Sequence, residues 1–584
     1  MHVATVKRGY VSKSGQERVY LTHLLRRTFR EGGKVKHETL ANLSALPDEQ
    51  IELLRRSLKG ETFVATDEAA AVVRSLPHGH VAAVMAQARA LGLPALLGPA
   101  GRERDIALAL IVSRVVYPRT KLSTLSWWAD TTVGADLGVT DTSTDQVYAA
   151  MDWLLTRQDR IEAKLARRHL TGETNPQRMA LFDLSSSWME GRHCPLAVRG
   201  YSRDGKKGKA QIEYGLLTDP AGRPVAVRVF PGNTGDPTAF IEAVRVVRDT
   251  FGLRQMVMVG DRGMITSARI DRLRELPAED DFGWLTCLRA PQIAALAADG
   301  GPLQMSLFDQ QDLAEIYHPD YPDERLIACR NPALATERAR KRADLLDATE
   351  ALLAPIVAAV AEGRLSGAAA IGLRVGKIID KYKMGKHLEV TITDTTLAVT
   401  RREAAIDAEA ALDGIYVIRT SVAAERLDSA GVVTAYKNLS HVERDWRSIK
   451  VDDLELRPIH HRLEERVKAH VLICMLAAYL VWHLRRAWAP LTYTDEEPPT
   501  PENPVSAAQR STTAARKASR RRDEHNQPVR SFRNLLDHLA TLTRNDIRHG
   551  PPTSATVVPT LTIPTPTQRR AFELLGTPVP LTLT

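Results

Sequence analysis

Residues 178–188 read RMALFDLSSSW, and this short apolar run decides the fold class. Four similar runs follow it: IEYGLLTD at 212–219, PVAVRVFPGN at 224–233, QMVMVGDRG at 255–263 and FGWLTCLRA at 282–290. Runs of this length, bounded by Gly, Pro and Asp, are typical of strands. The second and third runs are joined by a short turn, which indicates a hairpin, and a helical stretch precedes the fourth. This order predicts an α/β domain with a mixed sheet flanked by helices.

The sequence changes character between residues 291 and 410, where a long charged helix is expected around 335–363. We interpret 291–410 as a subdomain inserted into the sheet domain. GIYVIRT at 414–420 then predicts a returning strand. TAYKNLSHVERDWRSIK at 434–450 and the stretch at 460–488 predict helices, and the wide apolar stripe of the second would pack on the sheet. The sheet domain would therefore comprise 176–290 and 411–490.

Three further regions complete the predicted organisation. Residues 1–62 form a basic region with a hairpin, because strand-like runs flank Glu31, Gly32 and Gly33. Residues 63–175 carry helical periodicity from about residue 64 to 168, which predicts a second, helical domain. Residues 491–584 are rich in Pro, Ser, Thr and Arg, so we expect a largely disordered basic tail in which only 531–543 is helical.

The charge balance points to a polyanionic partner. The chain has 584 residues and a net charge of +9, with 44% hydrophobic and 26% charged residues, as in an ordinary globular protein. Lys and Arg dominate nucleic-acid affinity by neutralising phosphates. Basic side chains concentrate in two runs, although each run could also be a solvated surface: Lys7, Arg8, Lys13, Arg18, Arg26, Arg27, Arg30, Lys34 and Lys36, and Arg516, Lys517, Arg520, Arg521 and Arg522.

Cysteine usage and hydropathy indicate a cytoplasmic protein. The four cysteines are scattered without a CxxC pair, which argues against a disulfide framework or a structural zinc site. His193 beside Cys194, and His460 beside His461, lack a second ligand pair at zinc spacing. The first residues lack the apolar core of a signal peptide, and the apolar stretch at 471–482 is too short to cross a bilayer. We therefore expect no membrane partner.

Three acidic residues stand at positions where burying a charged carboxylate costs free energy or where a carboxylate could take part in a reaction. Asp183 interrupts an apolar strand, where an ionised carboxylate needs a partner or a metal ion. Asp261 directly follows a strand, at the edge where α/β proteins place their sites, although it could simply cap the next helix. Glu443 lies on a helix face with Trp446, Arg447 and Lys450, and alone would be an exposed helix glutamate.

Taken together, these residues predict a metal centre. Carboxylates within about 4 Å repel by roughly 4 kcal/mol per pair at an effective dielectric near 20. Divalent cations remove this repulsion, and Mg²⁺ prefers oxygen ligands. Two such ions can activate a water or a 3′-hydroxyl and stabilise the leaving oxygen in phosphoryl transfer. The expected cofactor is therefore a pair of Mg²⁺ ions, which Mn²⁺ can replace, held by Asp183, Asp261 and Glu443.

The spacing of residues around Glu443 resembles the DDE transposases of bacterial insertion sequences whose last catalytic residue lies in a Tyr, Arg, Glu, Lys motif. Tyr436, Glu443 and Lys450 stand at the motif's positions. The Arg position holds Leu439, so its positioning role would fall to Arg444 or Arg447. The resemblance extends through FDLSSSWMEG, YSRDGKKGKAQIEYGLL, FPGNTGDPTAF, VGDRGM and EAALDGIYVIRT.

The resemblance implies an RNase H-like fold and a magnesium-dependent enzyme acting on the terminal inverted repeats of its own element. It places Asp183 on the first strand, Asp261 at the end of the fourth and Glu443 on a helix after the insertion. It also implies double-stranded DNA as substrate and a homodimer in the synaptic complex, at work on the nucleoid. Two rivals remain: an RNase H-like nuclease without strand transfer, and a transposase-derived DNA-binding protein without catalysis, which Leu439 would favour.

Several residues are expected to contact DNA. By resemblance, Tyr436 and Lys450 would bind phosphates near the scissile bond. Trp446 would either stack on an unpaired base or belong to the core. The loop that follows Tyr201 would track the DNA backbone or be a plain solvated turn. The full expected set is Tyr436, Lys450, Trp446, Arg447, Arg262, Arg203, Lys206, Lys207 and Lys209.

One short peptide suggests a protein partner. Gln304, Met305, Ser306, Leu307 and Phe308 resemble the peptide by which bacterial proteins dock on the replicative sliding clamp, although Leu307 and Phe308 could instead anchor the loop. Other enzyme motifs do not occur: the chain has no GxxxxGK[ST] loop, no HExxH helix and no GxSxG elbow. Nucleotide hydrolysis and metalloprotease chemistry therefore have no support.

Overall fold

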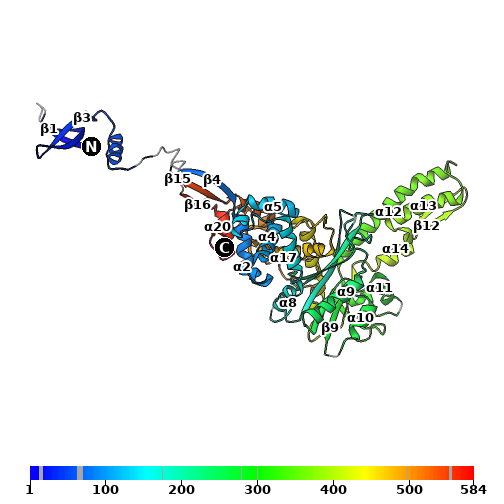
Figure 1. The fold of residues 1–584 in the computed structure, drawn as a ribbon. Coiled ribbons are helices and arrows are strands. Elements are labelled where there is room, and N and C mark those ends of the chain that lie inside the picture. Colours follow the sequence, from blue (N-terminus) through cyan, green and yellow to red (C-terminus); the bar gives the residue numbers. More distant parts are fainter. Residues whose placement is uncertain are drawn as a thin grey trace. The chain divides into compact units, whose positions relative to one another are not determined.

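The computed structural model describes residues 1–583 except 12–16, 62, 64–69, 174, 192, 278, 299, 496 and 551–555. The chain divides into two units, each described by itself below. Unit 1 comprises Met1–Ser75 and Arg544–Thr562, and unit 2 comprises Leu76–Thr543 and Ile563–Thr584 (Figure 1). Unit 1 therefore combines the first 75 residues with a segment near the end of the chain.

An eight-stranded mixed sheet forms the centre of unit 2, in the order β10-β11-β14-β9-β8-β5-β6-β7. Its strands are β5 (Met179–Trp188), β6 (Gln211–Thr218), β7 (Pro224–Pro231), β8 (Gln255–Val259), β9 (Asp281–Cys287), β10 (Leu313–Ile316), β11 (Arg325–Arg330) and β14 (Ile415–Thr420). β5 runs antiparallel to β6 and parallel to β8, and β8 runs parallel to β9. The prediction of a mixed α/β sheet is confirmed.

The central strands are apolar on both faces because helices cover both. Every residue of β6 is buried, and on β5 only Asp183 and Trp188 are partly exposed. Continuous apolar runs of this kind are expected of strands covered on both sides. The predicted hairpin joins β6 to β7, and Asp219 closes its turn, because its carboxylate accepts the backbone N–H groups of Ala221 and Arg223 at 3.0 and 2.8 Å.

The helices of the sheet domain follow the expected order. α9 (Asp236–Arg245) and α10 (Ser267–Arg274) flank β8, and α11 (Ala290–Leu296) follows β9. α15 (Ser429–Lys437) and α16 (Leu439–Arg447) follow β14, and α16 continues into a π-helical turn, Ser448–Asp452. α17 (Glu464–Ala487) packs against α4, α7 and β7. α17 is long and apolar enough to cross a membrane, but 83% of its apolar window is buried inside the protein, as in a core helix.

A helical layer precedes the sheet, as expected. It contains α2 (Gly79–Ala90), α3 (Leu93–Leu97), α4 (Arg102–Val116), α5 (Lys121–Ala129), α6 (Thr132–Asp136), α7 (Thr144–Leu155) and α8 (Gln158–His169). α4 is buried continuously from Ile106 to Val116, because α2, α7 and α17 pack around it. One expectation is wrong: Ala70–Pro77 forms strand β4 and not a helix. β4 joins β15 in a three-stranded sheet, a pairing with distant residues that local periodicity does not reveal.

Unit 1 contains the expected basic hairpin and one more strand. β2 (Glu17–Glu31) and β3 (Lys34–Asn42) pair in antiparallel fashion, and Gly32 and Gly33 turn the chain with φ of 60° and 79°. Two consecutive positive φ angles are the geometry that glycine permits in a tight hairpin. β1 (His2–Val11) extends the sheet beside β2, and α1 (Asp48–Leu58) follows. The second sheet is formed by β4, β15 (Thr543–His549) and β16 (Val557–Leu561).

The insertion between β9 and β14 consists of two structural parts. β10 and β11 extend the large sheet, with β11 antiparallel to β14. Residues 332–410 form α12 (Pro332–Ala361), α13 (Ala368–Tyr382), β12 (Leu388–Ile392), β13 (Leu397–Arg401) and α14 (Glu403–Ala410). α12 and α13 lie side by side with β12 (Figure 1) and share a core that includes Leu346, Leu353, Ile371 and Leu388. Only this second part is a separate subdomain.

The expectation of a disordered tail is wrong for the described residues. The tail forms α18 (Thr512–Arg520), α19 (Phe532–Ala540) and α20 (Pro566–Glu573), whose first turns are capped by Ser511, Ser531 and Thr565. Phe532 and Phe572 are buried in the main core. Lys517 of the expected basic run is also buried and donates to the carbonyls of Ala489 and Thr494. The Pro and Ser content therefore reflects helix starts and ordered loops.

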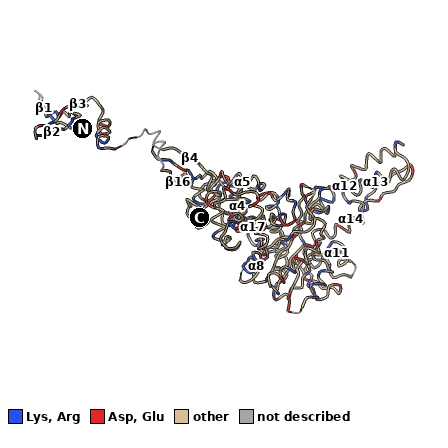
Figure 2. The backbone as a smooth tube through the Cα atoms, in the orientation of Figure 1, with Lys and Arg blue, Asp and Glu red and all other residues tan. Residues whose placement is uncertain are grey.

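Figure 2 shows Lys and Arg distributed over the whole chain and not confined to the two basic runs.

Candidate active site

Asp183 lies in the middle of β5, between the buried side chains of Phe182 and Leu184. Burial raises the pKa of Asp183 to about 6, and the negative charges of Glu443 and Asp261 add to the rise. A backbone hydrogen bond from Leu184 and the charge of Arg203 oppose it. The three carboxylates that the sequence singles out therefore act on one another electrostatically across the fold.

Asp261 and Glu443 reach this region from two other elements. Asp261 follows β8 in a turn, where its carbonyl accepts the N–H groups of Met264 and Ile265 and its carboxylate accepts that of Arg262 at 2.6 Å. Glu443 lies on α16, which packs against β5. Both side chains are exposed. The carboxylates thus gather from a central strand, the end of its parallel neighbour and a covering helix.

The residues fit divalent metal ions by their chemistry. In the described part of the chain, no three His, Cys, Asp or Glu side chains already stand at metal-ligand spacing. The carboxylates nevertheless supply hard oxygen donors, and their mutual repulsion is what a bound cation relieves. Asp183 forms no ion pair shorter than 4 Å with any described residue, so its charge is not neutralised by a direct contact. Asp183, Asp261 and Glu443 would hold the metal ions.

Arg203 lies among acidic groups and not on an open DNA-facing surface. Its guanidinium lies 2.5 Å from Asp236 and 3.2 Å from Glu213, and its backbone N–H donates to Ser186 at 3.1 Å. Burial raises the pKa of Glu213, on β6, to about 7, while Arg203 opposes the rise. Asp236 and Glu213 are thus the ion-pair partners of Arg203 in this conformation, and its expected contact with the DNA backbone stays a prediction.

Sequence reasoning missed Glu213 and Asp236. Glu213 interrupts an apolar strand run, the same signal that identified Asp183. Asp236 reads as an ordinary helix start after Gly235, so only the fold reveals its position. A Cβ atom on Gly263 would lie 3.7 Å from the Asp236 carboxylate and 3.8 Å from that of Asp261, so both acids border this glycine.

Lys450 lies beside the candidate catalytic strand. Its ammonium group is 2.5 Å from Asp204 and 3.1 Å from the hydroxyl of Ser185, which stands two residues after Asp183 on β5. Burial lowers the pKa of Lys450, and Asp204 opposes this. Asp204 also pairs with Arg457. Neither Asp204 nor Arg457 was foreseen, because both stand in loops without any recognisable pattern.

The other expected DNA-binding residues occupy varied positions. Tyr436 is half-buried, and burial together with Cys287 and Asp261 raises its pKa. Arg262, Arg447, Lys206 and Lys207 are exposed. Lys206 lies over the ring of Trp188 at 5.4 Å, and Lys209 pairs with Glu190 at 2.5 Å. These side chains remain candidates for contact with phosphates.

Trp446 and Leu439 belong to the core. Trp446 is 6% exposed, and its ring centroid lies 4.9 Å from that of Tyr214. The expected stacking on an unpaired base is therefore unavailable in this conformation, and the core alternative holds. Leu439 packs against the main core at the start of α16, where an arginine would have to bury its charge.

The peptide expected to dock on a sliding clamp is folded against the protein itself. Met305–Phe308 forms a 3₁₀ turn, and Phe308 is 5% exposed in a small core beneath β10, β11 and α11. Leu307 packs against the same core, and Gln304 precedes the turn. Docking would require both apolar side chains to leave this core, so the structure does not support the clamp as a partner.

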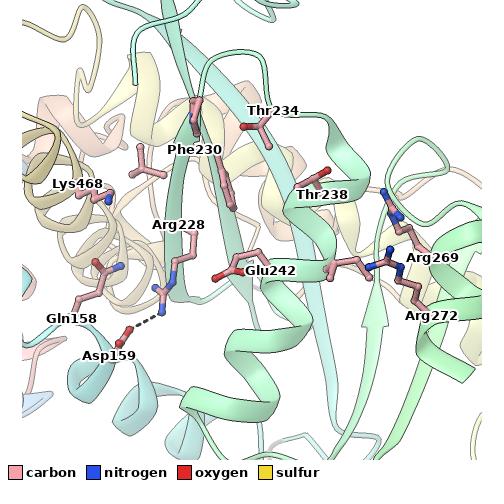
Figure 3. A pocket seen from close by; sticks show the side chains of 13 residues that line it. Gln158, Asp159, Arg228, Phe230, Thr234, Thr238, Glu242, Arg269, Arg272 and Lys468 are labelled. Atoms are coloured by element: carbon pink, nitrogen blue, oxygen red, sulfur yellow. Dashed lines mark hydrogen bonds and ion pairs between the residues drawn. The ribbon is translucent and has the colours of Figure 1, made fainter. Parts of the chain in front are cut away.

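A cavity of about 780 Å³ in the described part of unit 2 is not lined by any of the three carboxylates. Figure 3 shows Arg228 pointing toward Asp159 on one side, Arg269 and Arg272 on the other, and Glu242 between them. Arg228 is already paired with Asp159 and Glu162. The size of this cavity therefore does not locate the chemistry, which depends on the carboxylates at the sheet.

A nearby carboxyl group makes the stability of the protein depend on pH. Burial raises the pKa of Asp445 to about 8. The charge of Asp219 adds to this rise, whereas Arg444 and Arg485 oppose it. One carboxyl oxygen of Asp445 has no hydrogen-bond partner. The folded state thus prefers the neutral acid, so this group's contribution to stability falls as pH rises from about 4 to about 8. We expect Asp445→Asn to remove that loss and to unfold at higher urea than the wild type above about pH 7.

Urea midpoints measured across this pH range check the expectation. Asp452→Asn, at an exposed position on the following turn, is the matched control and should keep the wild-type profile. Parallel profiles for the wild type and Asp445→Asn would show that Asp445 ionises normally in the folded protein.

Two family models match the sequence. The description "IS1634 family transposase, N-terminal domain" matches residues 10–71, and "Transposase DDE domain" matches residues 185–480, just over half of the chain. The second match contains Asp261 and Glu443 and begins two residues after Asp183. A search of curated proteins gave no match. A solved structure described as "Cryo-EM structure of piggyBac transposase synaptic complex with hairpin DNA (SNHP)" is 8% identical, with 66% of this chain and 67% of that chain covered and a TM-score of 0.32.

Proposed function

The chain belongs to the insertion-sequence transposases that carry a DDE domain, and we propose on this premise that it cuts and rejoins DNA at the terminal inverted repeats of its own element. In this proposal the sheet is an RNase H-like core, unit 1 takes part in binding the repeats, and two protomers join two ends. The protein would act on the nucleoid in the cytoplasm. The observation that carries the proposal is that the three acids come from adjacent elements: Asp183 from β5, Asp261 from the end of the parallel neighbour β8, and Glu443 from α16, which packs on β5.

The proposed chemistry is phosphodiester hydrolysis followed by transesterification. Bound Mg²⁺ or Mn²⁺ ions would activate the attacking oxygen and stabilise the leaving 3′-oxygen. Asp183 would be a fixed ligand because its strand is buried on both sides, whereas the exposed Asp261 and Glu443 have room to close on the ions. Lys450 would orient a phosphate beside β5, with Asp204 holding the lysine in place. Such preorganised charges stabilise the transition state more than the bound substrate.

Arg203 would act as an internal counter-charge in the resting enzyme. It neutralises Asp236 and Glu213 beside the catalytic carboxylates and lowers the cost of gathering so many acids. Two protonation-sensitive groups, Asp183 and Glu213, therefore share one cation.

The test uses purified protein and a labelled duplex that carries one end of the element and its flanking DNA, together with a target plasmid. We expect cleavage at the end of the repeat with Mg²⁺ or Mn²⁺, no cleavage with EDTA, and joined products when the target is present. Cleavage without joining would instead identify a nuclease. Binding without cleavage in either metal would identify a DNA-binding protein and contradict the proposal.

A further inference from the structure

A second cavity in unit 2, of about 380 Å³, has four Lys or Arg side chains and three histidines among the fourteen residues that line it. It lies between α4, the start of α5, α17 and the loop that follows Leu454. Its lining includes Arg114, Lys121, Arg457, His461 and His470. None of the three candidate catalytic acids lines it, so it is separate from the site described above.

Two buried basic side chains in this cavity lack acidic partners. Arg114 and Lys121 are 5% and 6% exposed, and neither forms an ion pair with any carboxylate in the described ranges. Lys121 donates to Nδ1 of His470 at 3.3 Å. Arg114 donates to two backbone carbonyls, while its Nε has no hydrogen-bond partner. A buried charge without a counter-charge is costly, so such a pair is expected where an anion binds.

The neighbouring groups do not neutralise this positive charge. Burial and the nearby cations lower the pKa of His461 to about 3 and that of His470 well below its usual value, so both imidazoles are neutral. Glu455 lies at the rim and pairs with Arg119 at 3.3 Å, and both side chains are half-exposed. Burial and the charge of Arg114 also lower the pKa of Lys121 well below its usual value, and a bound anion would oppose this shift. The inside of the cavity therefore offers an anion the guanidinium of Arg114, the amino group of Lys121 and polar N–H groups.

The start of α5 adds to the preference for an anion. Thr120 caps this nine-residue helix, accepting the N–H of Ser123 at 3.2 Å, and Thr120, Lys121 and Leu122 all line the cavity. The first turn of a helix carries unpaired N–H groups and the positive end of the helix dipole. The start of α5 and the buried basic side chains thus favour an anionic ligand for two independent reasons.

We propose that this cavity binds a phosphate group, and that in the working protein this phosphate belongs to the backbone of bound DNA. The second half of the proposal rests on the proposed function. The link is structural: Arg457 lines the cavity and pairs with Asp204, which also pairs with Lys450. Lys450 contacts Ser185, close to Asp183 on β5. A DNA strand that reaches the carboxylates would therefore have this pocket close beside its path.

One substitution at the rim and one inside the cavity test the pocket. Leu122 is 59% exposed at the mouth, so Leu122→Glu adds a repelling charge there, and Leu122→Gln is its neutral control. Lys121→Met provides a second variant that keeps the length of the side chain. In thermal unfolding at fixed ionic strength, inorganic phosphate should raise the midpoint of the wild type and Leu122→Gln above that in chloride. The rise should disappear in Leu122→Glu and Lys121→Met.

The second arm measures DNA binding in EDTA, so that cleavage plays no part in the readout. For a duplex carrying the element's end, the slope of log Kobs against log salt should fall in magnitude by about one in Leu122→Glu and Lys121→Met, as for the loss of one phosphate contact. Leu122→Gln should keep the wild-type slope.

The two arms separate the possible sources of phosphate. Stabilisation by phosphate together with a reduced slope would support the proposal. Stabilisation with unchanged slopes would show a pocket for free phosphate and overturn the assignment to DNA. No stabilisation and unchanged slopes would overturn the pocket as a whole. None of these readouts requires catalysis, so failure of the proposed function would be recognised separately, by absent cleavage in the wild type.

Discussion

Asp183→Asn is expected to reduce the rate of DNA cleavage by about a thousandfold or more while the protein stays folded and binds DNA. Removing one member of an interdependent catalytic set typically lowers the reaction rate by three or more orders of magnitude. The amide keeps the shape of the carboxylate but loses the charge that a metal ion requires. Asp261→Asn and Glu443→Gln should have effects of the same order. Single-turnover cleavage of a labelled element end, with Mg²⁺ and with Mn²⁺, provides the measurement.

The matched control is Asp452→Asn, which removes an exposed acid on the turn after α16 and should cleave at the wild-type rate. Circular dichroism and DNA binding in EDTA separate lost chemistry from lost folding. Because the charge of Asp183 is costly where it lies, its removal should not lower the thermal midpoint of the metal-free protein. Near-normal cleavage by any of the three variants would exclude that residue as a metal ligand.

Glu324→Gln is expected to lower the free energy of unfolding of unit 2 by about 3–5 kcal/mol, because it leaves a buried arginine without its counter-charge. Glu324 accepts two hydrogen bonds from Arg419 on β14, at 2.6 and 2.5 Å, and one from Arg274 at 3.1 Å. The side chains of Glu324 and Arg419 are 1% and 6% exposed. Glutamine fits the same space, so the change isolates the charge. Urea unfolding at neutral pH gives the measurement.

Glu337→Gln is the control for this change. Glu337 pairs with Arg340 one turn along α12, at 2.7 Å, but both side chains are more than half exposed. Exposed pairs of this spacing contribute only about 0.3–0.5 kcal/mol. If Glu324→Gln shifted the urea midpoint as little as Glu337→Gln, the buried pair of Glu324 and Arg419 would not stabilise the attachment of β10 and β11 to the sheet.

The sheet and the three acids could be predicted because their signals are local. An acid inside an apolar strand, an acid directly after a strand and a helix with Tyr436, Glu443 and Lys450 on regular spacing are all visible in short stretches of sequence. The hairpin between β6 and β7 follows from the short turn at 220–223, whereas the order of the strands in the sheet depends on pairings between distant residues. The metal centre that these three acids are expected to form stays a prediction.

The features that were missed depend on distant contacts. Arg203 reads as one basic residue in a polar loop, and only the fold brings it to Glu213 and Asp236. β4 has Val72 and Val73 in a stretch that also suits a helix, and pairing with β15 decides between the two. The tail contains too few apolar residues to fold by itself, but Phe532 and Phe572 fill space that other helices provide. None of these contacts can be inferred from the amino-acid composition alone.

The position of α19 and α20 has a consequence for synthesis of the protein. Both helices pack against α2, near the start of unit 2, and Trp488 donates to the carbonyl of Ala571. A ribosome therefore releases α2 long before the residues that cover it. A chain stopped by a frameshift before residue 532 would expose this apolar surface, become a substrate for proteases and be removed. Cells carrying a damaged copy of the gene would then accumulate no shortened protein.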